Sequence, residues 1–159
     1  MCMPICADYI FTVTTFSIYR MNAFHNPLIY LVDNDQGEHF LVQSIFDEQS
    51  DSYAIRCFSD GADLITQLTH RLDARFPDLI LLDLHMPILS GYDVLRLLKG
   101  DPDWKGIPVI IYSASTDRLA RKRCLELGCS VFLDKSSFYQ NDENVLTSFM
   151  ILPLTTHEN

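Results

Sequence analysis

Two patterns of hydrophobic and polar positions alternate along the chain. Short apolar runs, the pattern of buried strands, occur at residues 28–32, 53–58, 78–84, 109–115 and 130–135. Segments with apolar residues at helical spacing lie between them, at residues 38–49, 62–76, 92–100 and 116–128. The run at 78–84 is the most apolar and is predicted to be the central strand. This alternation predicts a parallel sheet covered by helices on both faces.

The helical segments carry signals for their buried faces and for their ends. In the first, the expected apolar face consists of Phe40, Leu41 and Ile45, with Phe46 as a further candidate. In the second, it consists of Leu64, Ile65, Leu68 and Leu72, and Pro77 is expected to end the helix. The third should end at Gly100. The fourth should begin at Thr116 or Asp117 and stop at Gly128.

The chain is expected to form one domain, since 159 residues are enough for one hydrophobic core. We expect residues 1–26 to be a poorly ordered N-terminal extension, in which Met21 is a second plausible start. Residues 27–152 should form the domain, and residues 153–159 a C-terminal tail. The polar segment before the tail predicts at most a weak last helix, capped by Ser136 or Ser137.

Composition and charge narrow the classes of function. The formal charge of −9 argues against non-specific nucleic-acid binding, which needs a basic surface. The five cysteines lack the spacing of a metal site and are interpreted as reduced thiols of a cytoplasmic protein. No apolar run reaches the roughly 18 residues that predict a membrane span. Four histidines show no ligand spacing and are interpreted as ordinary surface or capping residues: His25, His39, His70 and His157.

Polar residues stand at the carboxyl ends of the predicted strands, where open parallel sheets bind their ligands. Asp33 and Asn34 end the first strand, and Asp83 lies near the end of the third. Ser113 ends the fourth strand and Lys135 the fifth. A lone aspartate at a strand end more often caps a helix, but four such strand ends together favour function. Carboxylates, a hydroxyl and an ammonium suit a hard cation with oxygen ligands and a phosphoryl group.

Four stretches of the sequence resemble the receiver domain of two-component response regulators. They are "LVDND", "DLILLDLHMPILSGYDVLRLLK", "IPVIIYSAS" and "LGCSVFLDKS", and the resemblance covers about residues 28–137. It is closest in kind to single-domain, chemotaxis-regulator-like receivers. The resemblance implies a flavodoxin-like (βα)5 fold, a doubly wound α/β structure with a five-stranded parallel sheet. The expected domain at 27–152 would then be a receiver domain.

The resemblance also implies a role for each matching residue. Asp83 matches the phosphoacceptor, a carboxylate nucleophile that takes a phosphoryl group from a phosphohistidine. Lys135 matches the lysine that contacts the phosphate, and Ser113 the switch hydroxyl. Phe132 falls on the position of the aromatic switch residue. These residues would couple a local change of charge to a change of surface.

A Mg²⁺ ion is the cofactor that the resemblance implies. Its expected ligands are Asp33, Asn34, Asp83 and the backbone carbonyl of His85. The family usually has an acid where this chain has Asn34, whose amide oxygen can bind Mg²⁺ but adds no charge. We therefore predict weaker Mg²⁺ binding and slower phosphotransfer than with a second acid. With fewer like charges nearby, the pKa of Asp83 should also be raised less.

The residues around Asn34 leave two readings of Asp35 open. Asp35 lies two residues after Asp33, so in an extended strand both would point to one side and Asp35 could replace the missing acid. Alternatively, Asp35 caps the first helix, with Gly37 and Glu38 in its first turn.

The resemblance implies a phosphoacceptor signalling domain, and not an enzyme with turnover. Its expected partners are a sensor histidine kinase or a histidine phosphotransfer protein, and a downstream protein target, with neither nucleic acid nor membrane. The alternative is a receiver-like interaction module that works without phosphorylation, an idea that Asn34 motivates. An aspartate-nucleophile phosphatase is least favoured, because His85 stands where such enzymes usually have a second acid.

Overall fold

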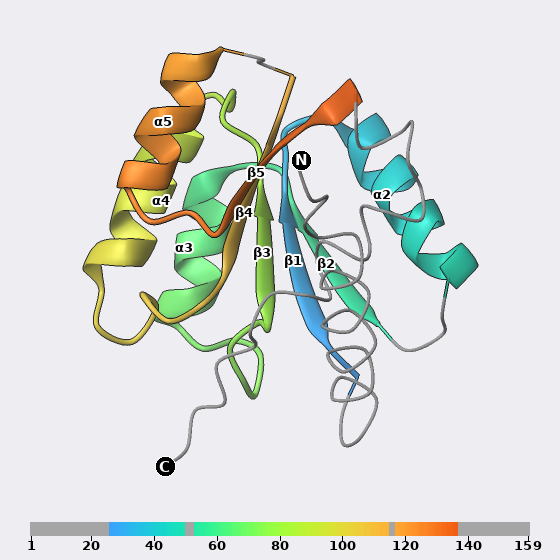
Figure 1. The fold of residues 1–159 in the computed structure, drawn as a ribbon. Helices are drawn as coiled ribbons and strands as arrows, with labels where there is room; N and C mark the ends of the chain where they lie inside the picture. The colour runs from blue at the N-terminus through green and yellow to red at the C-terminus, as the bar shows by residue number, and fades with distance from the viewer. Residues whose placement is uncertain (1–25, 50–52, 115–116, 137–159) are drawn as a thin grey trace, which may run out of the picture.

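The computed structural model describes residues 26–49, 53–114 and 117–136 (Figure 1). Its strands form one parallel sheet in the order β2-β1-β3-β4-β5, which is the order of a flavodoxin-like sheet. Their bounds are Leu28–Val32 for β1, Ala54–Phe58 for β2, Leu79–Leu82 for β3, Val109–Ser113 for β4 and Val131–Asp134 for β5. The prediction that the third strand is central is confirmed.

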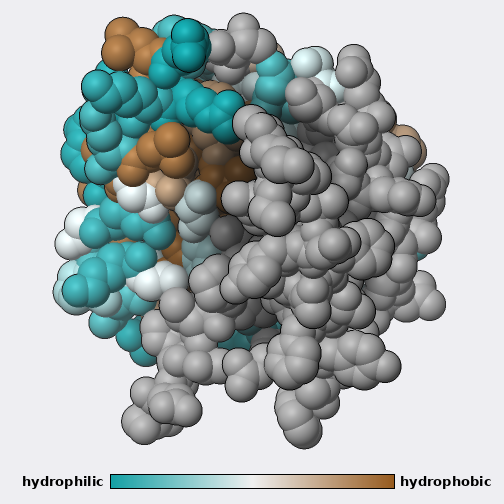
Figure 2. Space-filling view, viewed as in Figure 1, coloured by the Kyte–Doolittle hydropathy of each residue, from teal (hydrophilic) through white to brown (hydrophobic). Residues whose placement is uncertain are grey.

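Helices cover both faces of this sheet. Their bounds are Gln36–Gln49 for α2, Gly61–Thr69 for α3, Gly91–Gly100 for α4 and Arg118–Glu126 for α5. Figure 1 shows α2 on one side of the sheet and α3, α4 and α5 on the other. The space-filling view shows hydrophilic side chains over much of the described surface at α4 and α5, with smaller hydrophobic patches among them (Figure 2). Ser136, one of the two expected caps of the last helix, is described, and its N–H donates to Asp134 Oδ1 at 2.7 Å. The rest of that expected helix and both chain ends lie outside the described residues.

Each strand supplies side chains to two separate hydrophobic layers, since successive residues point to opposite faces. In β1, Tyr30 joins the layer under α3, α4 and α5, whereas Ile29 and Leu31 join the layer under α2. This double burial explains why β1 and β3 are continuously apolar, whereas the outer strand β2 has exposed positions and includes Arg56. None of the helices in the described part of the chain has the length and hydrophobicity of a membrane span.

The predicted apolar face of α2 is partly wrong. Phe40 is 71% exposed and Leu41 is also exposed, whereas Val42 and Phe46 are buried against the sheet. The pairs 41/45 and 42/46 both have helical spacing and differ by one residue, about 100° around the helix. Hydrophobic spacing alone could not choose between them, and packing against the sheet buries the second pair. Ile45 is half-buried and packs against the same layer, as predicted.

The second predicted helix is shorter than expected. α3 ends at Thr69 and not before Pro77, so Leu72 is 65% exposed. Arg71 has a left-handed φ of 47°, and its N–H donates to the Leu68 carbonyl while the Leu72 N–H donates to the Gln67 carbonyl. This is a Schellman motif, in which the left-handed residue is usually glycine. An arginine at that position gives no sequence signal for the end of the helix.

The predicted ends of the last two helices agree with the structure. α4 ends at Gly100, with Lys99 in its last turn. The N-cap of α5 is Asp117, whose side chain accepts from the Leu119 N–H, and Gly128 follows the helix with a left-handed φ of 95°.

Candidate functional site

Four predicted site residues lie together at the carboxyl edge of the sheet. Asp33 and Asp83 follow β1 and β3 directly, and Ser113 and Lys135 end or follow β4 and β5. Backbone bonds continue the ladder past the strands, because the Asp83 N–H donates to the Val32 carbonyl at 2.9 Å. The two aspartates are therefore held on adjacent strands, 1% and 4% exposed, and Ser113 is fully buried.

Lys135 supplies positive charge to these two carboxylates. Its Nζ donates to Asp33 Oδ2 at 2.6 Å and lies 3.8 Å from Asp83 Oδ1. Burial raises the pKa of Asp83 above its usual value, the Lys135 ammonium opposes this rise, and the Asp33 carboxylate adds to it. The edge therefore contains two desolvated carboxylates that share one ammonium.

The loop after Asp83 is fixed by backbone contacts. The His85 N–H donates to Asp83 Oδ2 at 3.1 Å, and the Gly91 N–H donates to the Leu84 carbonyl at 3.1 Å. A Cβ at Gly91 would lie 2.1 Å from the Asp83 carbonyl oxygen, so only glycine allows α4 to begin here. The start of α4 is thus pressed directly onto the backbone of Asp83.

Phe132 lies in β5 on the side of the sheet that α5 covers. It is buried and pairs in register with Ile111 of β4. The Arg121 guanidinium of α5 donates to the Phe132 carbonyl at 3.4 Å and lies 5.9 Å from the centre of its ring. Phe132 is therefore joined both to the strand that carries Ser113 and to α5, while its switch role stays a prediction.

The structure favours one of the two readings of Asp35. Asp35 is exposed and immediately precedes α2, and its Oδ1 accepts from the Gly37 N–H at 2.7 Å. This is the hydrogen bond of a helix cap, so Asp35 does not replace the missing acid in this structure. Asn34 is also exposed.

The donor set can be tested against a bound cation. No group of three or more His, Cys, Asp or Glu side chains in the described residues forms a metal cluster. A cation site here would therefore need the Asn34 amide and the His85 carbonyl besides Asp33 and Asp83. All of these donors are oxygens, as Mg²⁺ prefers, although one of them, Asp33, pairs with the Lys135 ammonium in this structure. The residues fit a hard divalent cation.

Four contacts at this edge were not predicted from the sequence. The Tyr112 hydroxyl donates to Glu38 Oε2, and Glu38 Oε1 lies 3.9 Å from Lys135 Nζ. The Tyr112 ring centre lies 4.7 Å from the same Nζ. The half-buried His39, interpreted as an ordinary surface or capping residue, donates from Nε2 to the Asp33 carbonyl at 2.7 Å and so joins the first turn of α2 to the end of β1. The sequence signal for Glu38 was its place in the first turn of α2, where a carboxylate is also favoured for the helix alone.

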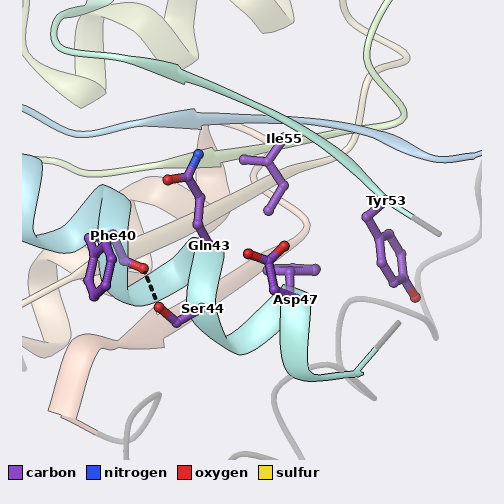
Figure 3. A pocket seen from close by; sticks show the side chains of 7 residues that line it. Phe40, Gln43, Ser44, Asp47, Tyr53 and Ile55 are labelled. Atoms are coloured by element: carbon purple, nitrogen blue, oxygen red, sulfur yellow. Dashed lines mark hydrogen bonds between the residues drawn. The ribbon is translucent and has the colours of Figure 1, made fainter. Parts of the chain in front are cut away.

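A hollow of about 320 Å³ lies between α2 and β2 (Figure 3). Its lining consists of Phe40, Gln43, Ser44, Phe46, Asp47, Tyr53 and Ile55. It shares no residue with the strand-end site, and Figure 3 shows the Ser44 hydroxyl bonded to the Phe40 carbonyl of its own helix. The chemistry of the described residues therefore lies at the strand ends and not in this hollow.

The sequence matches a known family over most of its length. The response regulator receiver domain matches residues 29–145. The chain belongs to the response regulator receiver domain family. The resemblance predicted from the strand-end motifs is thereby confirmed, and so is the flavodoxin-like fold.

Curated relatives of this receiver domain include regulators of different sizes. Rcp1 of Synechocystis is 30% identical over 116 residues, which cover 70% of this chain and 79% of Rcp1. The regulator PleD of Caulobacter vibrioides is 39% identical over 83 residues, which cover 52% of this chain. The aligned part spans only 17% of PleD, and in RcaC of Microchaete diplosiphon only 10%.

Solved structures of receiver domains have the same fold. Rcp1 in its Mn²⁺-bound form is 26% identical, with a TM-score of 0.70 over 83% of this chain and 97% of that chain. The phosphorylated cyanobacterial phytochrome response regulator RcpA is also 26% identical, with a TM-score of 0.72 over 85% of this chain and 98% of that chain.

Proposed function

We propose that this receiver domain takes a phosphoryl group onto Asp83 from a phosphohistidine of a sensor kinase or a phosphotransfer protein. It would then signal by contact with a downstream protein. The observation that carries this proposal is the buried Asp83 carboxylate beside Asp33, with the Lys135 ammonium 3.8 Å from Asp83 Oδ1. The phosphorylated form of the relative RcpA supports the same chemistry.

In the proposed transfer, a carboxylate oxygen of Asp83 attacks phosphorus. The new P–O bond forms as the P–N bond to the histidine breaks, and the leaving imidazole nitrogen takes a proton from solvent. Negative charge grows on the phosphoryl oxygens between the two carboxylates. The Lys135 ammonium lies close enough to Asp83 to neutralise part of this charge.

A Mg²⁺ ion would be held by Asp33, Asn34, Asp83 and the carbonyl of His85, and it would neutralise charge on the oxygens of the transferred group. The Mn²⁺-bound form of Rcp1 supports a divalent cation in this family. Because Asn34 is a neutral amide, the site attracts the cation less strongly than it would with two adjacent acids after β1.

The proposed signal leaves the site through Ser113 and Phe132. Ser113 would donate to an oxygen of the aspartyl phosphate, and Phe132 would rotate into the space that Ser113 leaves. Phe132 already contacts Arg121, so its movement would be felt at the exposed face of α5. That face is where we propose that a protein target reads the signal.

The proposed setting is the cytoplasm. Cys57, Cys124 and Cys129 are free thiols in the described part of the chain, as expected in a reducing compartment. The chain would act there as a phosphoacceptor that assists its own phosphorylation, without turnover of a substrate.

The test is incubation with acetyl phosphate and MgCl₂, followed by intact mass spectrometry. The wild type should gain the mass of one phosphoryl group, and hydroxylamine, which cleaves acyl phosphates, should remove it. Asp83→Ala should gain none. Asp103→Ala is the matched control, because Asp103 is an exposed acid in the loop before β4, at the opposite edge of the sheet.

The second candidate is an interaction module that works without phosphorylation. The exposed Asn34, in the place of an acid, is the observation that favours it. If the wild type gains no phosphoryl group at saturating Mg²⁺ while it still binds its partner, this candidate replaces the first.

A further inference from the structure

We propose that Glu38 and Tyr112 form a second binding position for the Lys135 ammonium. With this position available, Lys135 can leave Asp33 to a divalent cation and still remain at the site. Glu38 is thus a positioning residue that acts through Lys135, outside the motif that identifies the family. The inference rests on the proposed function and adds to it.

The first step of the argument is the charge around Lys135. In the described part of the chain, three carboxylates lie within 3.9 Å of Nζ: Asp33 at 2.6 Å, Asp83 at 3.8 Å and Glu38 at 3.9 Å. Lys135 is bonded directly to Asp33, which is also an expected ligand of the cation. A cation and an ammonium on the same buried carboxylate repel each other strongly, because the surroundings screen charge poorly.

The second step is that Glu38 is held in place to accept the ammonium. Its Oε2 accepts from the hydroxyl of Tyr112, a fully buried residue, and its Oε1 lies on the side of Lys135. A shift of about 1 Å would bring Nζ and Oε1 to the usual length of a charge-assisted hydrogen bond, about 2.8 Å. The Tyr112 ring, 4.7 Å from Nζ, adds an attractive aromatic face to the same position.

The third step is the link to Asn34. The site lacks a second acid directly after β1, and Glu38 brings a third carboxylate to the same edge from the first turn of α2. This carboxylate stands on the lysine side of the site and not among the expected cation ligands. Glu38 would thus make up for the negative charge that Asn34 does not supply, because it binds the Lys135 ammonium and leaves Asp33 to the cation.

The experiment measures cation affinity on the full chain, with Mn²⁺ titrated by electron paramagnetic resonance and Mg²⁺ by competition. Glu38→Gln keeps the shape and the acceptor for Tyr112 but removes the charge that binds Lys135. We expect the Mn²⁺ Kd to rise about fivefold, the size of a coupling between contacting charged groups. Tyr112→Phe should raise it by a smaller factor, because it releases Glu38 from its position.

Asp35→Asn is the matched control. It removes one negative charge at the start of the same helix, and asparagine caps a helix about as well as aspartate. Its Kd should change less than about twofold, since an exposed charge is well screened. An equal effect of Asp35→Asn and Glu38→Gln would overturn the proposal, because it would reduce Glu38 to a distant charge.

A double variant tests whether Glu38 acts through Lys135. Lys135→Met alone should tighten Mn²⁺ binding, since it removes the competing ammonium from Asp33. Adding Glu38→Gln to Lys135→Met should then leave the Kd unchanged. If Glu38→Gln still weakens binding in that background, Glu38 acts on the cation directly and the proposal is wrong.

The phosphorylation rate provides a second readout. With acetyl phosphate, Glu38→Gln should be slow at low Mg²⁺ and recover the wild-type rate at saturating Mg²⁺. A wild type that binds no divalent cation would overturn the cation role in the proposed function together with this inference. A wild type that binds Mn²⁺ with the same Kd as Glu38→Gln would overturn this inference alone.

Discussion

On each face of the sheet, a buried tyrosine hydroxyl donates to a carboxylate that also faces a cation. We call Asp33, Glu38, Asp83, Tyr112 and Lys135 the site cluster. The Tyr30 cluster, on the other face, consists of Tyr30, Arg56, Gln67 and Asp73. In it, the Tyr30 hydroxyl and the Gln67 amide both donate to Asp73 Oδ2, the amide at 2.9 Å, and Arg56 pairs with Asp73 Oδ1 at 2.6 Å.

The two clusters differ in their balance of charge. The Tyr30 cluster has one carboxylate for one guanidinium, and that guanidinium belongs to a side chain that is 53% exposed. The site cluster has three carboxylates for one ammonium, and the Lys135 side chain is only 14% exposed. A balanced cluster satisfies its own members and contributes stability. An unbalanced cluster keeps surplus negative charge, which attracts a cation and resists ionisation of its buried acids.

The largest expected effect comes from Asp73→Ala in the Tyr30 cluster. This change removes the acceptor of the buried Tyr30 hydroxyl and leaves the Gln67 amide with only its longer hydrogen bond to that hydroxyl, at 3.4 Å. The free energy of unfolding should fall by about 3 kcal/mol, measured by urea denaturation. Asp103→Ala, at an exposed ion pair, should change it by less than about 0.5 kcal/mol. A change in Mg²⁺ affinity on Asp73→Ala would break the comparison, because this cluster should have no part in cation binding.

The second effect is the removal of the positively charged side chain from each cluster. Without Lys135, the two buried aspartates lose their ammonium, so Lys135→Met should lower the free energy of unfolding by about 2 kcal/mol in the absence of divalent cations. Added Mg²⁺ should recover more stability in this variant than in the wild type, since it binds only the folded site. Arg56→Met is the control: its exposed pair should contribute less than about 1 kcal/mol, and Mg²⁺ should recover none of it.

The third effect depends on pH. Burial raises the pKa of Asp83 in the folded chain, so the folded state holds this proton to a higher pH than the unfolded state does. Stability from this group therefore falls as pH rises from the usual aspartate value, about 4, through the raised folded value. Asp83→Asn should raise the Tm at neutral pH, and the gain should shrink toward zero below about pH 4. A gain that does not change with pH would show that the surplus charge is not its cause.

The smallest effect on stability is expected for Asn34→Asp, which adds charge to the unbalanced cluster. Asn34 is exposed, so the free energy of unfolding should change by less than about 0.5 kcal/mol. The Mg²⁺ affinity should nevertheless increase, because a carboxylate replaces a neutral amide among the expected ligands. An unchanged affinity, measured by isothermal titration calorimetry, would contradict the account of Asn34.

The sequence was informative wherever a local pattern had one physical solution. The apolar run at 28–32 became β1 with the same bounds, and the strand ends brought Asp33, Asp83, Ser113 and Lys135 to one edge. Prediction from the sequence was wrong where tertiary packing or an unusual backbone conformation determined the structure. Arg71 follows α3 with a left-handed φ, and an arginine in the sequence does not predict that conformation.

The partnership of Glu38 and Tyr112 could not be predicted for a related reason. The two residues are 74 positions apart. The sequence pattern of each element predicts that element without any contact between them. From the sequence alone, Glu38 is interpreted as a favourable acid in the first turn of a helix. Tyr112 is interpreted as one of the apolar residues of a buried strand. Only the assembled sheet shows that the hydroxyl of one meets the carboxylate of the other.

The ion pair between Lys135 and Asp33 joins residues 102 positions apart, across a sheet in which β3 and β4 lie between their strands. We expect the closure of so long a segment to be a late event in folding, because contacts made before it must offset its entropy cost. A chain that has paired β1 to β4 but not β5 holds two buried acids and no ammonium. If Asp83 accepts a phosphoryl group as proposed, it would do so beside the Lys135 ammonium only in the completed sheet.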